Sequence, residues 1–265
     1  MAVGIRIVAV DWSGDRLAAH RKIWLAEVVD GRLVRLEDGR SRDVLTDHLI
    51  EMATADPQMV VGLDFAFSMP AWYLERLGVA SALELWAVAD RDADSWLAAC
   101  QWPLWGRPGV ARPNDVPDHF RQTERDVPKT AGIQPKSVFQ IGGAGAVGSG
   151  SLRGMRSLHR LHQAGFSIWP FDPAGWPRVI EIYPRLLTGA VNKSSATHRA
   201  EYLAGRHPEI NGVLLMRASA SEDAFDAAVS ALIMARHLDE LTNLSPAADH
   251  QTLLEGQIWH PRPAE

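Results

Sequence analysis

Acidic residues stand where short apolar segments of this chain end, and this placement limits the folds that the chain can adopt. Asp11, Asp64 and Glu181 each follow a run of aliphatic residues. Runs of this kind are typical of buried β-strands. A carboxylate at the end of a buried strand is costly unless it is paired, hydrogen-bonded or bound to a metal ion. We therefore expect several strands that carry acids toward a common polar site.

The first part of the chain has the pattern of an antiparallel meander that leads into a parallel strand. After a strand over 5–10, apolar runs at 22–29 and 32–36 are joined by Asp-Gly, which is a strong hairpin signal. A helix over 41–55, capped by its first serine, precedes the strand that ends at Asp64. A helical crossover into a buried strand favours parallel pairing. The pattern predicts an α/β fold in which antiparallel and parallel strands share one sheet.

The remainder of the chain fits one domain over 1–245, with a long insertion. Sheet-forming patterns stop over 70–150, which is rich in proline and arginine and which we interpret as an insertion or lid. Residues 246–265 form a weakly patterned tail. We expect the later elements to be helices at 80–89, 151–164, 196–204 and 221–241 and strands at 166–171 and 179–183.

Two more acids, Asp223 and Asp226, open the last long helix, whose other residues are mostly small or apolar. Ser219 and Glu222 fit a capping box, so acids here can have a purely structural role. A helix that is apolar on most sides is buried, however, and residues three apart share one face. Asp223 and Asp226 could therefore project together toward the acids at the strand ends.

Clustered carboxylates repel one another and raise one another's pKa unless a cation neutralises them. Mg²⁺ or Mn²⁺ is the natural partner, because the ligands are all oxygen atoms. We therefore take Asp11, Asp64, Asp223 and Asp226 as candidate metal ligands and catalytic residues, with Glu181 as an auxiliary acid. Two such ions about 3.5–4 Å apart can clamp the attacking and leaving oxygens of a phosphoryl transfer.

Charge is unevenly distributed along the chain, and this points to an anionic ligand. Residues 101–160 contain nine Lys and Arg against four Asp and Glu, a net charge of +5, although the whole chain carries −5. A solvated loop face is an equally simple explanation. Lys193 follows the strand of Glu181 and could contact a phosphate, as could His198 and Arg199 beside it, although a solvated helix face is the simpler interpretation. The candidate substrate-binding residues are Arg107, Arg112, Arg121, Arg125, Lys136, Gly143, Gly145 and Lys193.

A glycine-rich segment at 142–150 supports a rival interpretation. Gly143, Gly145 and Gly148 spell GxGxxG, a strand-like run precedes them, and a helix and a strand ending at Asp172 follow. This order is similar to a dinucleotide-binding fingerprint. We expect the helix to begin near Ser151, which would leave the third glycine outside it and disfavour that fingerprint. A loop that binds an anion through its backbone amides, or a simple hinge, remains open.

Four short motifs, taken in order, resemble the predicted RNase H-like nuclease family catalogued as domain of unknown function 429. The motifs are the segments 8–14 (VAVDWSG), 62–66 (GLDFA) with Pro70, 181–184 (EIYP) and 222–228 (EDAFDAA). The resemblance covers about residues 5–240, and the family is similar to the Holliday-junction resolvase branch of the RNase H fold. Resolvases typically have glutamate at the position of Asp64, and their minimal fold lacks the proline-rich insertion.

The resemblance implies an RNase H-like α/β fold, with a mixed five-stranded sheet and flanking helices. It also implies an acid on the first strand, another at the end of the fourth, and two on the final helix. These roles fall on Asp11, Asp64, Asp223 and Asp226, while Glu181 matches the family's strand-ending Glu-x-x-Pro. The implied activity is metal-dependent hydrolysis of phosphodiester bonds in a nucleic acid or nucleotide substrate. Two alternatives stay open: an oxidoreductase that binds a dinucleotide through 142–150, and a nucleic-acid-binding module without catalysis.

Composition narrows the remaining possibilities. A single cysteine, Cys100, allows neither an internal disulfide nor a zinc cluster. No apolar run reaches 18 residues, and the N-terminus lacks a secretion signal, so we expect a cytoplasmic protein without a membrane segment. Neither a nucleophile-elbow motif nor a P-loop occurs, which disfavours an α/β-hydrolase and a P-loop ATPase.

Overall fold

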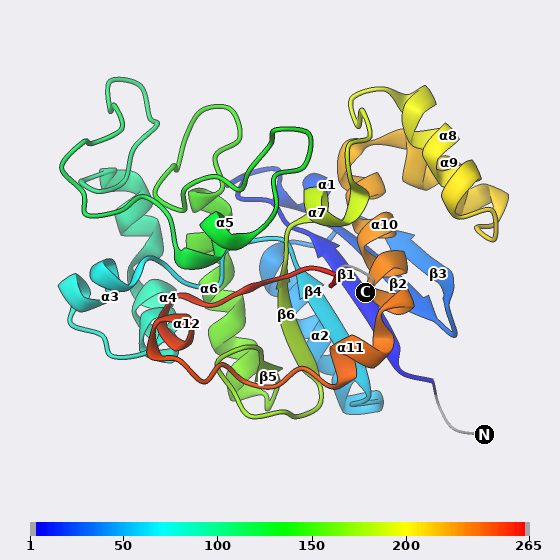
Figure 1. Cartoon of the computed structure of the whole chain (residues 1–265), viewed down its shortest axis with the longest axis horizontal. Helices are drawn as coiled ribbons and strands as arrows, with labels where there is room; N and C mark the ends of the chain where they lie inside the picture. Colours follow the sequence, from blue (N-terminus) through cyan, green and yellow to red (C-terminus); the bar gives the residue numbers. More distant parts are fainter. Residues whose placement is uncertain (1–3, 263–265) are drawn as a thin grey trace.

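The computed structural model describes residues 4–262 and has a seven-stranded mixed sheet with helices on both faces (Figure 1). The strands are ordered β3-β2-β1-β4-β6-β5, and β7 pairs with β6 outside this path. The strands are β1 (Arg6–Asp11), β2 (Trp24–Val29), β3 (Arg32–Glu37), β4 (Met59–Leu63), β5 (Ser167–Ile168), β6 (Arg178–Ile182) and β7 (Ile258–Trp259). The α/β class is as predicted, but the sheet has two strands more than the five expected.

The predicted meander is present. β1 pairs antiparallel with β2 and β2 antiparallel with β3, whereas β1 pairs parallel with β4. Val29 is opposite Arg32, so the hairpin loop has two residues, Asp30 and Gly31. Both have positive φ, 49° and 73°, as the tight turn that matches strand twist requires. The Asp-Gly pair therefore forms the turn between β2 and β3, as predicted.

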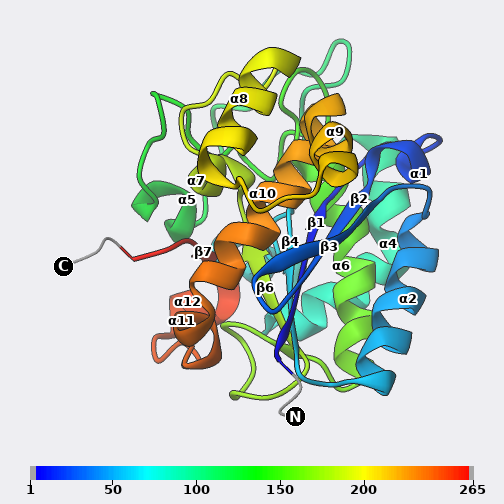
Figure 2. The same cartoon turned by 90° about the vertical axis from the view of Figure 1, so that its right-hand side faces the viewer.

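Alternate side chains along the strands point to opposite faces of the sheet, so the hydrophobic core consists of two clusters, one on each face. Val8, Val10 and Val61 belong to one cluster, and Ile7 and Val60 belong to the other. Successive strand side chains point to opposite faces, so a continuous apolar run is buried on both. Figure 2 shows α2, α4 and α6 on one side of the sheet and α7, α8, α10 and α11 on the other.

The described chain forms helices both before and after the long loops that follow β4. These helices are α1 (Ala19–Lys22), α2 (Arg42–Ala55), α3 (Ala71–Leu77), α4 (Ala82–Ala99), α5 (Gln122–Asp126), α6 (Gly148–Gln163), α7 (Pro184–Thr188), α8 (Ala196–Arg206), α9 (Gly212–Ala220), α10 (Glu222–Arg236), α11 (Leu238–Thr242) and α12 (His250–Glu255). The predicted serine cap of α2 is present, since Ser41 Oγ accepts from the Val44 amide.

The segment 70–150 is more than a covering loop. It contains no strand of the sheet, as expected, but its helix α4 contributes Leu85, Trp86 and Leu97 to the same core cluster as β1 and β4. Helices α4 and α6 pack against each other. Loop residues of the segment, among them Leu104 and Phe139, belong to this cluster as well, so much of the proposed insertion is integral to the hydrophobic core.

The tail after 245 forms regular structure despite its weak sequence pattern. Helix α12 and strand β7 lie there (Figure 2), and β7 pairs parallel with β6. The last long helix is also shorter than 221–241: α10 ends at Arg236 and α11 follows. Its cap is Ser221, whose Oγ accepts from the Ala224 amide, so the capping box on Ser219 is not formed.

Candidate functional site

Asp11 and Asp64 lie side by side at the ends of the two central parallel strands. Val10 of β1 pairs with Leu63 of β4, and the Asp64 amide donates to the Val10 carbonyl at 3.1 Å. Because the carboxyl ends of parallel strands meet at one edge of the sheet, the two acids follow their strands to the same place. Asp11 is buried, with 9% of its surface exposed, and Asp64 is half-buried.

Helix α10 brings the other two acids to this edge. It packs against β1 and β2, and its buried residues include Phe225, Ala228 and Val229. Asp226 is buried among them and Asp223, one turn earlier, is half-buried. The helix therefore presents its N-terminal acids beside the strand ends, as the pattern of apolar residues predicted.

The four acids influence one another electrostatically. Burial raises the pKa of Asp11 well above its ordinary value, and the charges of Asp64, Asp226 and Asp223 raise it further. Burial and Asp226 likewise raise the pKa of Asp64. The pKa of Asp223 and of Asp226 is also raised, chiefly by burial. Acids from β1, from the loop after β4 and from α10 thus form one electrostatic cluster.

Lys193 supplies a positive charge to this acid cluster. Its Nζ donates to Asp226 Oδ2, and its side chain is only 12% exposed. The same charge lowers the pKa of Asp11, Asp64 and Asp223. Lys193 was a candidate substrate-binding residue, and the structure places it among the acids.

Arg199 holds the backbone that carries Lys193. Its guanidinium donates to the Lys193 carbonyl and, at 3.0 Å, to the Ser219 carbonyl at the end of α9. Arg199 is 5% exposed, so it does not lie on the solvated helix face that its sequence context suggested. No local sequence signal distinguishes this arginine from a surface one, because both of its carbonyl partners are set by tertiary structure.

The oxygen-only donor set fits a hard divalent cation, although the side chains do not converge on one point. Within residues 4–262, no three Asp, Glu, His or Cys side chains are close enough to hold a metal ion together. Asp226 Oδ1 is nevertheless buried without a hydrogen-bond partner. An orphaned carboxylate oxygen in a buried cluster is the kind of atom that a cation satisfies. The residues that would hold Mg²⁺ or Mn²⁺ are Asp11, Asp64, Asp223 and Asp226.

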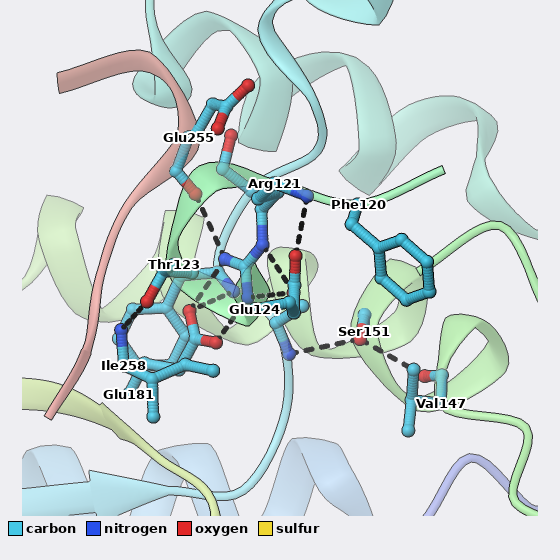
Figure 3. Close-up of polar contacts among 12 residues, drawn as sticks. Phe120, Arg121, Thr123, Glu124, Val147, Ser151, Glu181, Glu255 and Ile258 are labelled. Atoms are coloured by element: carbon cyan, nitrogen blue, oxygen red, sulfur yellow. Dashed lines mark hydrogen bonds and ion pairs between the residues drawn. The ribbon is translucent and has the colours of Figure 1, made fainter. Parts of the chain in front are cut away.

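Glu181 is engaged by a different cation. Arg121 Nη1 donates to Glu181 Oε2 at 2.8 Å and Nη2 to Oε1 at 2.5 Å, while the Phe67 amide donates to Oε2 at 2.9 Å (Figure 3). The same guanidinium reaches Glu124, with Nε to Oε1 at 2.8 Å, and donates to the Glu255 carbonyl at 2.9 Å. Arg121 and Glu181 are both buried, so the pair is a structural ion pair rather than an exposed contact for substrate.

The carboxylate of Glu255 joins this network from the tail. Its Oε1 accepts from the Ala71 amide at 2.7 Å and its Oε2 from the Gln122 amide at 2.6 Å. These amides stand at the first positions of α3 and α5, where helices have unsatisfied donors. Burial raises the pKa of Glu124, which outweighs the opposing attraction of Arg121. The network ties the 70–150 segment to the sheet and to the tail.

The other candidate cations lie apart from the acids. Arg107 and Arg112 are exposed on the loops of 70–150, and the Arg112 guanidinium lies over the rings of Trp105 and Phe120 at 5.9 and 5.7 Å. Arg125 is exposed and pairs with Asp118. Of the predicted substrate-binding residues, the structure therefore brings only Lys193 into the acid cluster, whereas Lys136 and the buried Arg121 line a pocket beside it.

The glycine-rich segment does not form a dinucleotide fingerprint in the sheet. Residues 137–141 make only an isolated bridge to Trp105, so the strand that should precede the glycines is not formed. Helix α6 begins at Gly148, earlier than the predicted Ser151, so the third glycine is inside the helix. Asp172 Oδ2 accepts from the Ile168 amide at 2.8 Å, so its side chain stabilises the local turn. Gly143 and Gly145 are exposed with φ of 82° and 71°.

A pocket of about 150 Å³, which we call the side pocket, lies beside the acid cluster. Asp64 and Tyr183 form the side toward the acids, and burial, followed by the charge of Asp64, raises the pKa of Tyr183. The loop after Asp11 meets helix α6 at this place: a Cβ on Gly14 would lie 2.4 Å from the Gly150 amide nitrogen. The lining residues are Trp12, Gly14, Asp64, Phe65, Ala66, Arg121, Glu124, Pro135, Lys136, Ala146, Val147, Gly150, Glu181, Ile182, Tyr183 and Ile258.

No family model, no curated protein and no solved structure matches this chain. None of the helices in the described part, residues 4–262, combines the length and apolar composition needed to cross a membrane. The function must therefore be argued from the acid cluster and its surroundings.

Proposed function

We propose that this protein is a phosphodiester hydrolase that depends on Mg²⁺ or Mn²⁺, with an RNase H-like active site. The observation that carries the proposal is the meeting of four acids from three separate segments, each of which has a raised pKa. Clustered carboxylates repel one another and lower the stability of the fold, so their presence together favours a functional role. Carboxylates with perturbed pKa values are typical of functional sites.

The order of the elements supports the RNase H-like interpretation. A three-stranded antiparallel meander leads through α2 into β4, which pairs parallel with β1. The acids stand at the end of the first strand, after the fourth strand and at the start of the last long helix. This is the placement that the resemblance to the resolvase branch implies for Asp11, Asp64, Asp223 and Asp226.

Asp11, Asp64, Asp223 and Asp226 would hold the divalent cation. When bound, the cation would supply activation of water and stabilisation of charge on the scissile phosphate. Lys193 neutralises Asp226 in the absence of another cation, and its flexible amine can turn toward a phosphate oxygen instead. Glu181 does not face the cluster as a free base, because Arg121 and the Phe67 amide occupy its carboxylate; its role is to orient the wall beside Asp64.

The first test is calorimetric titration of Mg²⁺ and Mn²⁺ into the full chain. We expect saturable binding that Asp226→Asn weakens at least about tenfold, because the variant removes a charged oxygen ligand. Asp239→Asn, an exposed acid on α11, is the matched control and should bind as the unmodified protein does. Equal binding by all three proteins would contradict the assignment of the site.

A nuclease screen follows, with single- and double-stranded DNA and RNA as probes. Cleavage that requires the divalent ion and is lost in Asp226→Asn supports the proposal. Salt-dependent binding of nucleic acid without cleavage by the metal-loaded protein would instead favour a non-catalytic binding module.

A further inference from the structure

The side pocket is lined by residues from the sheet and from segments far apart in the sequence. Trp12 comes from the loop after β1, Lys136 and Val147 from the 70–150 segment, and Ile258 from the tail. Its volume of about 150 Å³ is well above what one water molecule needs. A cavity of this size, lined in part by Asp64, has room for part of a ligand that also reaches the acids.

Much of the wall of the side pocket is apolar and held in place. Trp12 packs on Phe65 with ring centroids 4.8 Å apart, and its indole Nε1 donates to the Gly150 carbonyl at 3.1 Å. Val147 and Ile258 add aliphatic surface. Apolar walls favour a flat, weakly polar group and disfavour a hydrated ion or a bare phosphate.

The polar part of the side pocket offers no free positive charge inside. All three nitrogen atoms of the Arg121 guanidinium have acceptors. Nε donates to Glu124, Nη1 to Glu181 and to the Glu255 carbonyl, and Nη2 to Glu181, while Nη2 also forms an ion pair with Glu124. A phosphate inside the pocket would therefore face the carboxylates of Glu124 and Glu181 without a free cation to pair with, because Arg121 is already paired with both. Lys136 at the rim is exposed and forms no ion pair within residues 4–262.

We propose that the side pocket binds the base of a single nucleotide, with the phosphate of that nucleotide at the rim between Lys136 and the acids. The proposal rests on the proposed function, because it takes the acids as the place where the phosphodiester is cleaved. It narrows the substrate class to unpaired nucleotides: single strands, strand ends or a base turned out of a helix. A pocket that takes one base cannot take an intact base pair.

The test uses calorimetry on the full chain with defined probes: AMP and UMP, the nucleosides adenosine and uridine, ribose 5-phosphate and inorganic phosphate. With Mg²⁺ present, we expect the nucleotides to bind at least about tenfold more tightly than ribose 5-phosphate or inorganic phosphate, since contacts with the base add to the affinity. Ala146→Trp, which puts an indole into the side pocket, should abolish the difference. Ala144→Trp places the same bulk on an exposed neighbour that does not line the pocket and should leave it unchanged.

The rim is tested with a second pair of variants. Lys136→Ala should weaken nucleotide binding about tenfold and leave nucleoside binding unchanged, whereas Lys129→Ala, an exposed lysine of the same segment, should change neither. Equal affinity for nucleotides and inorganic phosphate, or nucleotide binding that Ala146→Trp does not affect, would overturn the proposal.

Nucleoside binding in EDTA separates this proposal from the hydrolase proposal. Binding of adenosine or uridine that Ala146→Trp blocks supports the base pocket even if the acids bind no metal. Metal binding and cleavage that persist in Ala146→Trp, with no loss of base binding, would leave the hydrolase proposal standing and refute the base pocket.

Discussion

Arg121 and Glu181 form a bidentate ion pair in the interior, with Nη–Oε distances of 2.8 and 2.5 Å and no more than 2% of either residue exposed. The pair joins a loop of the 70–150 segment to the central strand β6 at the edge of the side pocket. Glu181 is thus held by a bidentate pair with a buried arginine, whereas Asp226 is paired with Lys193 and, within residues 4–262, no ion pair engages Asp11 or Asp64. The bidentate pairing distinguishes Glu181, a structural acid, from the candidate catalytic acids.

Removal of the Arg121 charge should destabilise the protein strongly. Arg121→Met leaves Glu181 and Glu124 buried without their cation, and breaking a buried pair in this way costs about 3–5 kcal/mol. Urea denaturation monitored by circular dichroism measures the loss. Arg125→Met, four residues on and exposed, is the control and should change the free energy of unfolding by less than about 1 kcal/mol. Equal effects of the two variants would show that the buried pair has no special role.

Removal of the Asp11 charge should stabilise the metal-free protein. The pKa of Asp11 is raised above its ordinary 3.8, so the folded state binds the proton more tightly than the unfolded state. Stability is therefore lost as the pH rises from about 4 through the folded pKa, at about 1.4 kcal/mol for each pKa unit. Asp11→Asn removes this loss, and denaturation in EDTA at pH 8 should show a gain that vanishes near pH 4.

Mg²⁺ should make the unmodified protein more stable than Asp11→Asn. A ligand that binds only the folded state stabilises it, so millimolar Mg²⁺ should raise the free energy of unfolding of the unmodified protein and not that of Asp11→Asn. Asp239→Asn, an exposed acid, should respond to Mg²⁺ like the unmodified protein. A gain from Mg²⁺ in Asp11→Asn as large as in the parent would argue against Asp11 as a ligand.

His207 should make the protein sensitive to mild acid. It is fully buried, and burial together with Arg236 lowers its pKa to about 4. The unfolded state binds the proton near pH 6.5 and the folded state only near 4, so stability from this group is complete above pH 6.5 and falls as the pH drops toward 4. The loss is on the order of 2–3 kcal/mol. His207→Phe should flatten the dependence measured by denaturation between pH 4.5 and 7.5, and His198→Phe, which is exposed, should not.

The Glu255 carboxylate should anchor the tail to the N-termini of helices α3 and α5. Its two carboxylate oxygens accept the Ala71 and Gln122 amides, but a glutamine side chain has only one acceptor atom. Glu255→Gln should leave one partly buried amide without its acceptor and cost about 1 kcal/mol. Hydrogen exchange at Ala71 and Gln122 should accelerate in the same variant. Glu201→Gln, an exposed acid on α8, should alter neither measurement.

Local patterns in the sequence were sufficient for the central part of the fold. The aliphatic runs before Asp11 and Asp64 are buried on both faces, and the Asp-Gly turn fixed the first hairpin. Because strand ends of parallel neighbours meet, the proximity of Asp11 and Asp64 follows from the pattern alone. The apolar surroundings of Asp226 likewise identified a buried helix.

Two partners of Arg121 could not be inferred from local patterns, because Glu181 and the Glu255 carbonyl lie 60 and 134 residues away. Its place in the positively charged segment 101–160 suggested a residue that binds an anionic ligand. Tail elements α12 and β7 are only six and two residues long, too short for a periodic signal. They form because Glu255 and Ile258 meet partners on α3, α5 and β6 that tertiary packing supplies.

The walls of the side pocket come from opposite ends of the chain, Trp12 near the beginning and Ile258 near the end. During synthesis on a ribosome the sheet strands β1 to β4 emerge early, but the pocket lacks a wall until Ile258 has left the exit tunnel. A growing chain can thus bury its strands while the proposed substrate site is still incomplete. The order in which residues are made therefore places closure of the side pocket after the synthesis of strands β1 to β4.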